Sequence, residues 1–231
     1  MLALRKAFLI LGLLPLVNVV QASPIVLDAD HFTLAYESDQ LGPYSQGLVS
    51  GSQDTVYFLS SSFKAMTPGG QGAPGAQLQL TLTIDPGYTF AGLSFVERGN
   101  YYLLGNGAVD VETSVTLANP NTADSATLTL IPGSPLDTLQ NVTSWELGGT
   151  LGPLGAGSPQ TLLITLDSTL FASAPTGIAF IQNTYAGFQV ATESAAVPEP
   201  TSWTLLLAGV LAAMLAGRRV RVPGRVRRPM N

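Results

Sequence analysis

The sequence predicts an all-β protein whose body is an antiparallel β-sandwich of the jelly-roll kind. Apolar and polar residues alternate with a period of two along many short segments, as they do in half-buried strands. Clusters of glycine and proline separate these segments, and no body segment repeats apolar residues at helical spacing. The sequence has no internal repeat, which disfavours a propeller or a solenoid. An apolar segment flanks this body at each end of the chain.

The N-terminal segment has the layout of a secretory signal. Arg5 and Lys6 precede an apolar stretch over residues 7–17, and small or aliphatic residues lead up to Ala22. This order predicts a signal peptide over residues 1–22, with cleavage between Ala22 and Ser23. Its expected partners are the Sec translocon and signal peptidase. A core helix is the alternative, and the glycine and proline inside the stretch disfavour it.

The body, residues 23–196, reads as a series of short strands of one domain. The segment 77–84 is the clearest case, because Leu78, Leu80 and Leu82 alternate with glutamine and threonine. Threonine is expected on the wet face of a sheet. Strands are predicted over 32–36, 55–59, 77–84, 90–96, 109–117, 126–131, 161–166, 177–181 and 188–191, and loops over 67–72, 131–135 and 148–159.

The charge of the body excludes one class of partner. Lys64 and Arg98 are its two basic residues, against fourteen acidic ones, which leaves a formal net charge of −12 for residues 23–196. Such a surface repels phosphate backbones, so nucleic acid is not an expected partner. It favours solubility and attracts cations or basic partners.

Cysteine and histidine usage excludes several kinds of site. The chain has no cysteine, so the body depends on its core alone for stability and has no thiol nucleophile. His31 is the only histidine, which excludes a zinc site that needs two imidazoles.

The C-terminal segment, residues 197–231, combines a short motif, an apolar run and a basic tail. A single transmembrane helix is predicted over 201–217, although about 25 Å of helix is thin against a hydrocarbon core of about 30 Å. Thr204 is the only polar residue between Trp203 and Gly217, which disfavours the alternative of a buried helix in a soluble domain. The arginines after the run predict that this end stays cytoplasmic and that the body lies outside. The stop begins with Arg218, Arg219 and Arg221.

This tail resembles a PEP-CTERM sorting signal, an element of many exported proteins of Gram-negative bacteria. The residues that carry the resemblance are Pro198, Glu199 and Pro200, followed by the apolar run and the arginine cluster. The two prolines hold the motif extended, as a processing enzyme requires. The resemblance implies recognition by an exosortase, a membrane-embedded cysteine transpeptidase, and removal of the helix near the motif. It further implies an association with exopolysaccharide and a final location at the outer surface or in the extracellular matrix. The tail beyond Arg219 is longer than is common in the family.

The body offers few candidates for catalysis, and none of its residues is assigned a catalytic, cofactor or metal role. A serine triad would need His31, which lies beside Asp30 without a Gly-x-Ser-x-Gly elbow. Asp110 and Glu112 share a predicted sheet face, where a solvated surface is the expected role and a glycosidase pair the alternative. No cofactor is expected, with calcium at Asp28 and Asp30 left open. Glu97 and Arg98 are interpreted as a structural ion pair.

Aromatic residues offer a route to sugar binding, since flat rings pack against the apolar faces of sugars. The candidates are Tyr44, Tyr57, Tyr88, Tyr101, Tyr102, Trp145 and Tyr185. The expected function is a non-enzymatic surface or matrix protein associated with exopolysaccharide and biofilm. The alternative is a secreted polysaccharide hydrolase with paired carboxylates. Binding to another protein of the cell envelope is a third hypothesis.

Overall fold

The body folds into two antiparallel β-sheets. The computed structural model describes residues 24–69, 72–155, 159–195 and 202–217. The strands are β1 (Pro24–Asp28), β2 (Phe32–Glu37), β3 (Leu48–Val49), β4 (Thr55–Leu59), β5 (Lys64–Thr67), β6 (Gly75–Ile84), β7 (Tyr88–Gly105), β8 (Ala108–Ala118), β9 (Ser125–Leu130), β10 (Thr143–Leu151), β11 (Thr161–Ser173) and β12 (Gly177–Ser194). A short 3-10 helix, η1 (Ser38–Gln40), follows β2, and an α-helix, α1 (Ser202–Gly217), ends the described chain.

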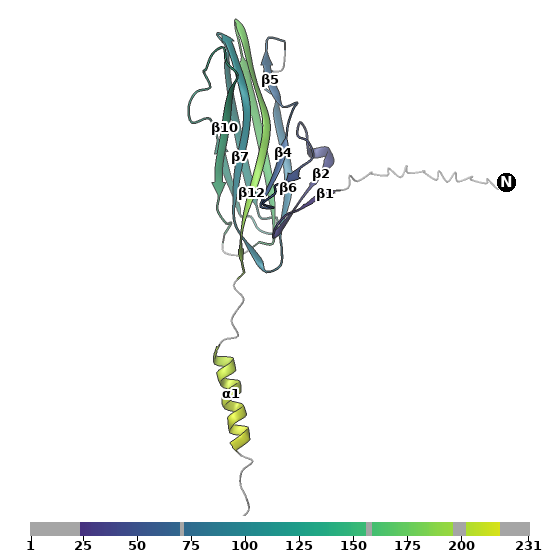
Figure 1. The fold of residues 1–231 in the computed structure, drawn as a ribbon, viewed down its shortest axis with the longest axis vertical. Coiled ribbons are helices and arrows are strands. Elements are labelled where there is room, and N and C mark those ends of the chain that lie inside the picture. The colour runs from purple at the N-terminus through teal and green to yellow at the C-terminus, as the bar shows by residue number, and fades with distance from the viewer. Residues whose placement is uncertain (1–23, 70–71, 156–158, 196–201, 218–231) are drawn as a thin grey trace, which may run out of the picture.

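Each sheet contains six strands, and the chain passes repeatedly between them. The first sheet has the order β1-β2-β6-β11-β8-β9. The second has the order β10-β7-β12-β4-β3, with β5 also paired to β12. In Figure 1 the strands β10, β7, β12 and β4 lie side by side along the long axis of the sandwich. Because β6, β7 and β8 alternate between the sheets, as β10, β11 and β12 do, the connections tie the two layers together.

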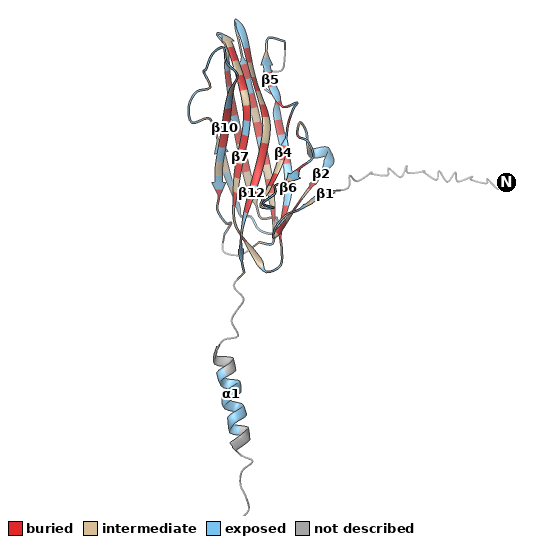
Figure 2. Cartoon of the chain, in the orientation of Figure 1, coloured by how far each residue is buried: buried red, intermediate tan, exposed pale blue. Residues whose placement is uncertain are grey.

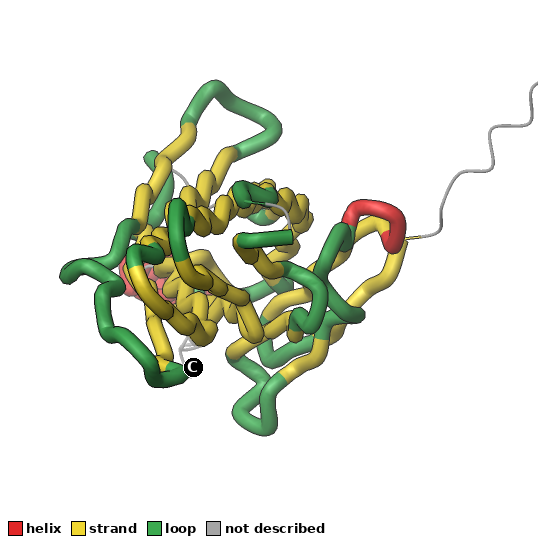
Figure 3. Tube along the Cα trace, turned by 90° about the horizontal axis from the view of Figure 1, so that it is seen from above, coloured by secondary structure: helices red, strands yellow, loops and turns green. Residues whose placement is uncertain are grey.

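The core lies between the two sheets and is built by the period-two pattern. Along β6 every second residue is buried (Figure 2). Buried residues alternate with more exposed ones in the same way along β8 and β11. Phe58, Phe95 and Phe188 come from three strands of the second sheet and pack against one another at ring-centroid distances of 5.1 to 6.3 Å. Full burial of one such side chain contributes about 1.5–3 kcal/mol. The view along the strands shows loops around their ends and η1 at the outer side of the sandwich, beside β1 and β2 (Figure 3).

The predicted β-sandwich is confirmed, and its strands are longer and more numerous than predicted. The segments 177–181 and 188–191 are parts of one strand, β12, which is bulged between Asn183 and Tyr185. The prediction of a loop over 148–159 is wrong at its start, because β10 continues through Gly148 and Gly149 to Leu151. A side chain at Gly149 would come within 2.7 Å of Leu128 on β9. The glycine therefore lets the edges of the two sheets approach. The jelly-roll assignment itself stays a prediction.

Candidate functional site

The outer face of the second sheet carries a row of aromatic and charged side chains that crosses four strands. Tyr57 on β4 and Tyr185 on β12 are stacked, with ring centroids 5.6 Å apart and planes 20° apart. The guanidinium of Arg98 on β7 lies 5.5 Å from the centroid of the Tyr185 ring. Its Nε donates to Oε2 of Glu146 on β10 at 2.7 Å. The row therefore joins β4, β12, β7 and β10 on the solvent side.

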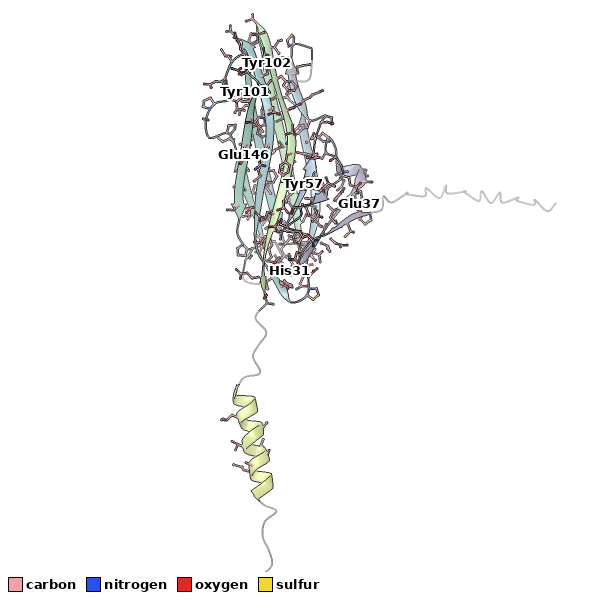
Figure 4. The ribbon with its side chains drawn as sticks, in the orientation of Figure 1. His31, Glu37, Tyr57, Tyr101, Tyr102 and Glu146 are labelled. Carbon is pink, nitrogen blue, oxygen red and sulfur yellow. The ribbon has the colours of Figure 1, made fainter. Side chains whose placement is uncertain are left out.

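A second part of this face continues along β12 toward the opposite end of the sandwich. Gln182 lies between Asn100 on β7 and Lys64 on β5, and all three side chains point to solvent. Phe180 is next along β12 and lies opposite Tyr102. We call this surface the tyrosine strip, which comprises Tyr57, Lys64, Arg98, Asn100, Tyr102, Phe180, Gln182 and Tyr185. Figure 4 shows Tyr102 near one end of the sandwich and Tyr57 farther along it.

The structure divides the predicted aromatic candidates into two groups. Tyr44, Tyr101 and Trp145 are buried in the core and are not available to a ligand. The partly exposed group consists of Tyr57, Tyr88, Tyr102 and Tyr185. Three of these belong to the tyrosine strip, and Tyr88 stacks on His31 elsewhere. The sequence reasoning missed Phe180 and Gln182, although the alternation along 177–182 contains the signal.

The outer face of the first sheet is of a different kind. Its central strands present mainly threonine, as in the row formed by Thr165, Thr116 and Thr127 on β11, β8 and β9. The hydroxyls of Thr116 and Thr127 lie 3.0 Å apart. The acidic side chains Asp110, Glu112 and Asp167 share this face, and each of them is exposed. The prediction that Asp110 and Glu112 share one face of their strand, with Val109 and Val111 on the other face, is confirmed.

A buried polar cluster joins the two sheets inside the core. Glu97 is fully buried and accepts a hydrogen bond from Ser168 at 2.9 Å. It also contacts the Thr113 hydroxyl and the Asn183 amide. Thr113 and Ser168 belong to the first sheet, whereas Glu97 and Asn183 belong to the second. Burial raises the pKa of the Glu97 carboxyl, against the effect of these three hydrogen bonds.

The predicted ion pair between Glu97 and Arg98 is wrong. Neighbouring residues of a strand point to opposite faces, so Glu97 enters the core while Arg98 points to solvent. Arg98 pairs instead with Glu146, which lies opposite it on β10. The pattern of two adjacent opposite charges was misleading because sequence adjacency separates side chains in a strand.

A cleft of about 600 Å³ lies where the 131–139 segment passes the start of β8. Its lining residues include Asp110 and Asp137, together with apolar residues such as Leu103 and Leu136. The two aspartates come to one cleft from different parts of the chain. Glu112, the partner that the sequence suggested for Asp110, does not line it.

His31 lies in the turn between β1 and β2 and has structural contacts. Its ring stacks on Tyr88 with a centroid distance of 3.7 Å, and its Nε2 lies 3.3 Å from Asp30 Oδ2. Its φ of 69° is the left-handed conformation that a tight turn uses. Within the described ranges, no three His, Cys, Asp or Glu side chains gather closely enough to hold a metal ion. Calcium binding by Asp28 and Asp30 stays a hypothesis.

The C-terminal helix is where the sequence predicts it, but its role as a membrane span is not confirmed. None of the helices in the described part of the chain combines the length and the apolar character that a membrane span needs. The helix α1 has 16 residues and a length of about 24 Å, compared with about 30 Å of hydrocarbon. Several other predicted sites lie outside the described residues. They are the signal peptide over 1–22 with its cleavage site at Ala22 and Ser23, the motif Pro198, Glu199 and Pro200, and the stop at Arg218, Arg219 and Arg221.

Comparison with known families confirms the resemblance at the C-terminus. A family model described as the PEP-CTERM protein-sorting motif matches residues 196–221. The chain therefore carries the sorting signal of an exosortase substrate, which supports export and implies a membrane-anchored sorting signal. No curated protein sequence matches the chain.

Solved structures give only distant likenesses to the sandwich. One is infectious bursal disease virus Gt strain, at 11% identity over 69% of this chain and 48% of that chain, with a TM-score of 0.26. Another is TmCBM61 in complex with beta-1,4-galactotriose, at 10% identity, covering 75% of this chain and 88% of that one, with a TM-score of 0.23. Eiger TNF from S. frugiperda has 8% identity over 76% and 88% of the two chains, with a TM-score of 0.23. The chain spans about half the length of the first of these. Likenesses this distant say nothing of what the sandwich binds.

Proposed function

We propose that this protein is exported, processed by an exosortase and retained at the cell surface or in the extracellular matrix as a non-enzymatic module that associates with exopolysaccharide. The observation that carries the proposal is the PEP-CTERM motif over residues 196–221. A protein that carries this motif is delivered outside the inner membrane, where extracellular polymers are its surroundings. The outward-facing tyrosine strip supports a binding role there.

The proposed route assigns a task to each end of the chain. The signal peptide over 1–22 directs the chain to the Sec translocon, and cleavage after Ala22 frees the N-terminus. The C-terminal segment then holds the body on the outer side of the inner membrane, with the arginine tail in the cytoplasm. Processing near Pro198, Glu199 and Pro200 separates the sandwich from α1 and releases it to the outer surface.

The composition of the body is compatible with a location outside the cell. Without cysteine the fold is independent of the redox state outside the cell, and its two layers share one continuous apolar core. The net charge of −12 over residues 23–196 keeps the sandwich soluble and discourages self-association.

The second candidate function is a polysaccharide hydrolase, and the cleft beside β8 is the observation in its favour. Asp110 and Asp137 both line this cleft, and a pair of carboxyl groups is what glycoside hydrolysis requires. The binding module is the first choice because the exposed aromatic residues suited to sugar packing lie on the outer face of the second sheet. Among the described residues, no tyrosine or tryptophan lines this cleft.

Co-sedimentation of the full chain, in mild detergent, with the host's own exopolysaccharide separates the two functions. The proposed function predicts that the protein sediments with the polymer and that the polymer keeps its length. Shortened polymer, with loss of the effect in Asp110→Asn and Asp137→Asn variants, would establish the hydrolase instead. If the protein stays in the supernatant, its partner is not the polysaccharide.

A further inference from the structure

We propose that the tyrosine strip binds an acidic polysaccharide, one whose sugar rings carry carboxylate groups. This inference rests on the proposed function and names both the surface and the chemical class of its ligand. The strip follows β12 from Phe180 to the level of Gly187, which corresponds to about 20 Å at the rise of a strand. It is therefore long enough for several consecutive sugar rings.

The distribution of charge favours an anionic ligand at this face. Lys64 and Arg98, the two basic residues of the body, both point outward from the second sheet within the strip. Lys64 has no acidic partner within 4.0 Å among the described residues. Glu146 and Asp54 lie beside the strip, but each is engaged by a side chain of the second sheet. The outer face of the first sheet carries the carboxylates named above and, among the described residues, no basic one, so it repels a polyanion more strongly. A polyanion that approaches this acidic body is therefore directed to the second sheet.

Arg98 has a partner that a ligand can replace. Its ion pair with Glu146 is solvent-exposed, at 54% and 58% side-chain exposure, so it contributes little to stability. The guanidinium is a planar donor that binds carboxylates in a fixed geometry. A sugar carboxylate that arrives beside Tyr185 competes with Glu146 for the same donor.

Glycine gives the aromatic part of the strip its shape. The Tyr185 side chain lies over Gly187, where a Cβ would come within 2.4 Å of the tyrosine hydroxyl and 2.7 Å of its ring. Because Gly187 has no side chain, the Tyr185 ring lies directly against the backbone of the sheet and stacks on Tyr57. These rings at one end, with Tyr102 and Phe180 at the other, provide apolar surfaces for the C–H faces of sugars.

Amide groups lie between the two aromatic ends. Asn100 and Gln182 are opposite each other at the centre of the strip, beside Lys64. Their side chains both donate and accept hydrogen bonds, as recognition of sugar hydroxyls requires. The strip thus combines stacking, hydrogen bonding and cationic groups on one face.

The test measures the affinity of the full chain, in mild detergent, for two probes of matched length: alginate, a polyuronate, and dextran, a neutral glucan. We expect binding to alginate that weakens as salt rises, and weaker binding to dextran. Lys64→Gln and Tyr185→Ala should each lower the affinity for alginate about fivefold. Glu146→Gln should raise it, because Arg98 loses its competing carboxylate. Thr165→Ala, on the outer face of the first sheet, is the control and should leave it unchanged.

The outcomes separate this inference from the proposed function. Each variant should have the same thermal unfolding midpoint as the unmodified chain. A change in its affinity then results from the changed side chain of the tyrosine strip and not from unfolding. If the protein sediments with the host exopolysaccharide and the strip variants bind as tightly as the unmodified chain, the strip is not the site and the proposed function stands. Equal affinity for alginate and dextran would overturn the acidic specificity. If no polysaccharide is bound at all, both proposals fail.

Discussion

Glu97 on β7 and Asn183 on β12 meet inside the core, where the Asn183 amide donates a hydrogen bond to the Glu97 carboxyl group. Both residues belong to the second sheet, and hydroxyls of Thr113 and Ser168 complete the cluster from the first. The cluster is a polar connection across an otherwise apolar sandwich. Because unpaired polar groups are costly in a core, its members depend on one another.

Substitutions of Glu97 test this dependence. Glu97→Ala removes the acceptor of three buried hydrogen bonds and leaves a cavity, so we expect a loss of about 3 kcal/mol in the free energy of unfolding. Glu97→Gln keeps the shape, with a carbonyl for Ser168 and Asn183 and an amide for Thr113, and should cost less than about 1 kcal/mol. Urea unfolding measures both. Equal stability of the two variants would contradict a role for these hydrogen bonds.

The same carboxyl group predicts a dependence of stability on pH. Burial raises the pKa of Glu97 above its usual value of 4.5 in the folded state. The neutral acid satisfies the hydrogen-bonding groups of the cluster. Its proton is donated to the Thr113 hydroxyl oxygen, and the Thr113 hydroxyl can then donate to the Ser168 oxygen, which lies 3.1 Å away. The stabilisation by neutral Glu97 is therefore complete below the unfolded pKa and is lost as the pH rises through the folded pKa.

The measurement for this prediction is the difference in unfolding free energy between the unmodified chain and Glu97→Gln. We expect the unmodified chain to lose stability relative to the variant as the pH rises above about 4.5, by up to about 1.4 kcal/mol per pH unit. Asp54, whose pKa is lowered to about 2 by hydrogen bonds from Ser52, Gln189 and Thr55, acts in the opposite sense at low pH. Its effect is the same in both proteins and cancels. Parallel curves for the two proteins would show that Glu97 does not titrate in this range.

Gly99 is a glycine whose replacement should damage the fold directly, because its Cβ would overlap a neighbouring strand. An alanine Cβ there would lie 1.9 Å from the carbonyl oxygen of Gln182 and 2.6 Å from the Trp145 ring. We expect Gly99→Ala to cost about 2–3 kcal/mol, because both the bulged region of β12 and the buried indole must move. The matched control is Gly51→Ala, which meets nothing within 4 Å and should change stability by less than about 0.5 kcal/mol. Similar midpoints of urea unfolding for the two variants would contradict the close approach.

The sorting motif predicts where an unprocessed chain accumulates. Replacement of Pro198, Glu199 and Pro200 by alanine removes the two prolines that favour an extended backbone, and with them the proposed recognition motif. The full-length chain should therefore remain in the inner-membrane fraction. Immunoblots of fractionated host cells measure this. Pro223→Ala is the control, because it lies in the tail outside the matched residues 196–221. Accumulation of the control as well would mean that the tail, and not the motif, governs processing.

The strands could be predicted from the sequence where apolar and polar residues alternate regularly. Where every inward residue is apolar, as along β6, the strand was found almost to its ends. Where the core accepts a polar residue or a strand contains glycine, the pattern fails. Asn183 is a polar residue that points inward beside a bulge, and two separate strands were predicted where β12 is continuous. Gly149 lies in β10, but it is typical of loops, so a loop was predicted over the end of this strand.

The candidate site was harder to predict for a related reason. The tyrosine strip exists only through the pairing of β4, β5, β7 and β12, which are distant in sequence. A single sequence shows that Tyr57 and Tyr185 are tyrosines in strands, but the register that stacks them is a property of the folded sheet. Glu97 illustrates a different error. Its adjacency to Arg98 suggested a structural ion pair, although the alternation through Leu93 and Phe95 places Glu97 on the inward face and Arg98 on the outward face of β7. The PEP-CTERM motif could be predicted because its residues are adjacent in the sequence, and the family model matches residues 196–221.

The most direct test of the account is the intact mass of the protein recovered from the extracellular matrix of its host. Export and exosortase processing predict a chain that begins at Ser23 and lacks the helix Ser202–Gly217 with its arginine tail. Its mass should be well below the 24.1 kDa of the full sequence. Recovery of the complete chain from Met1 to Asn231, confined to the inner membrane and absent from the matrix, would contradict the account.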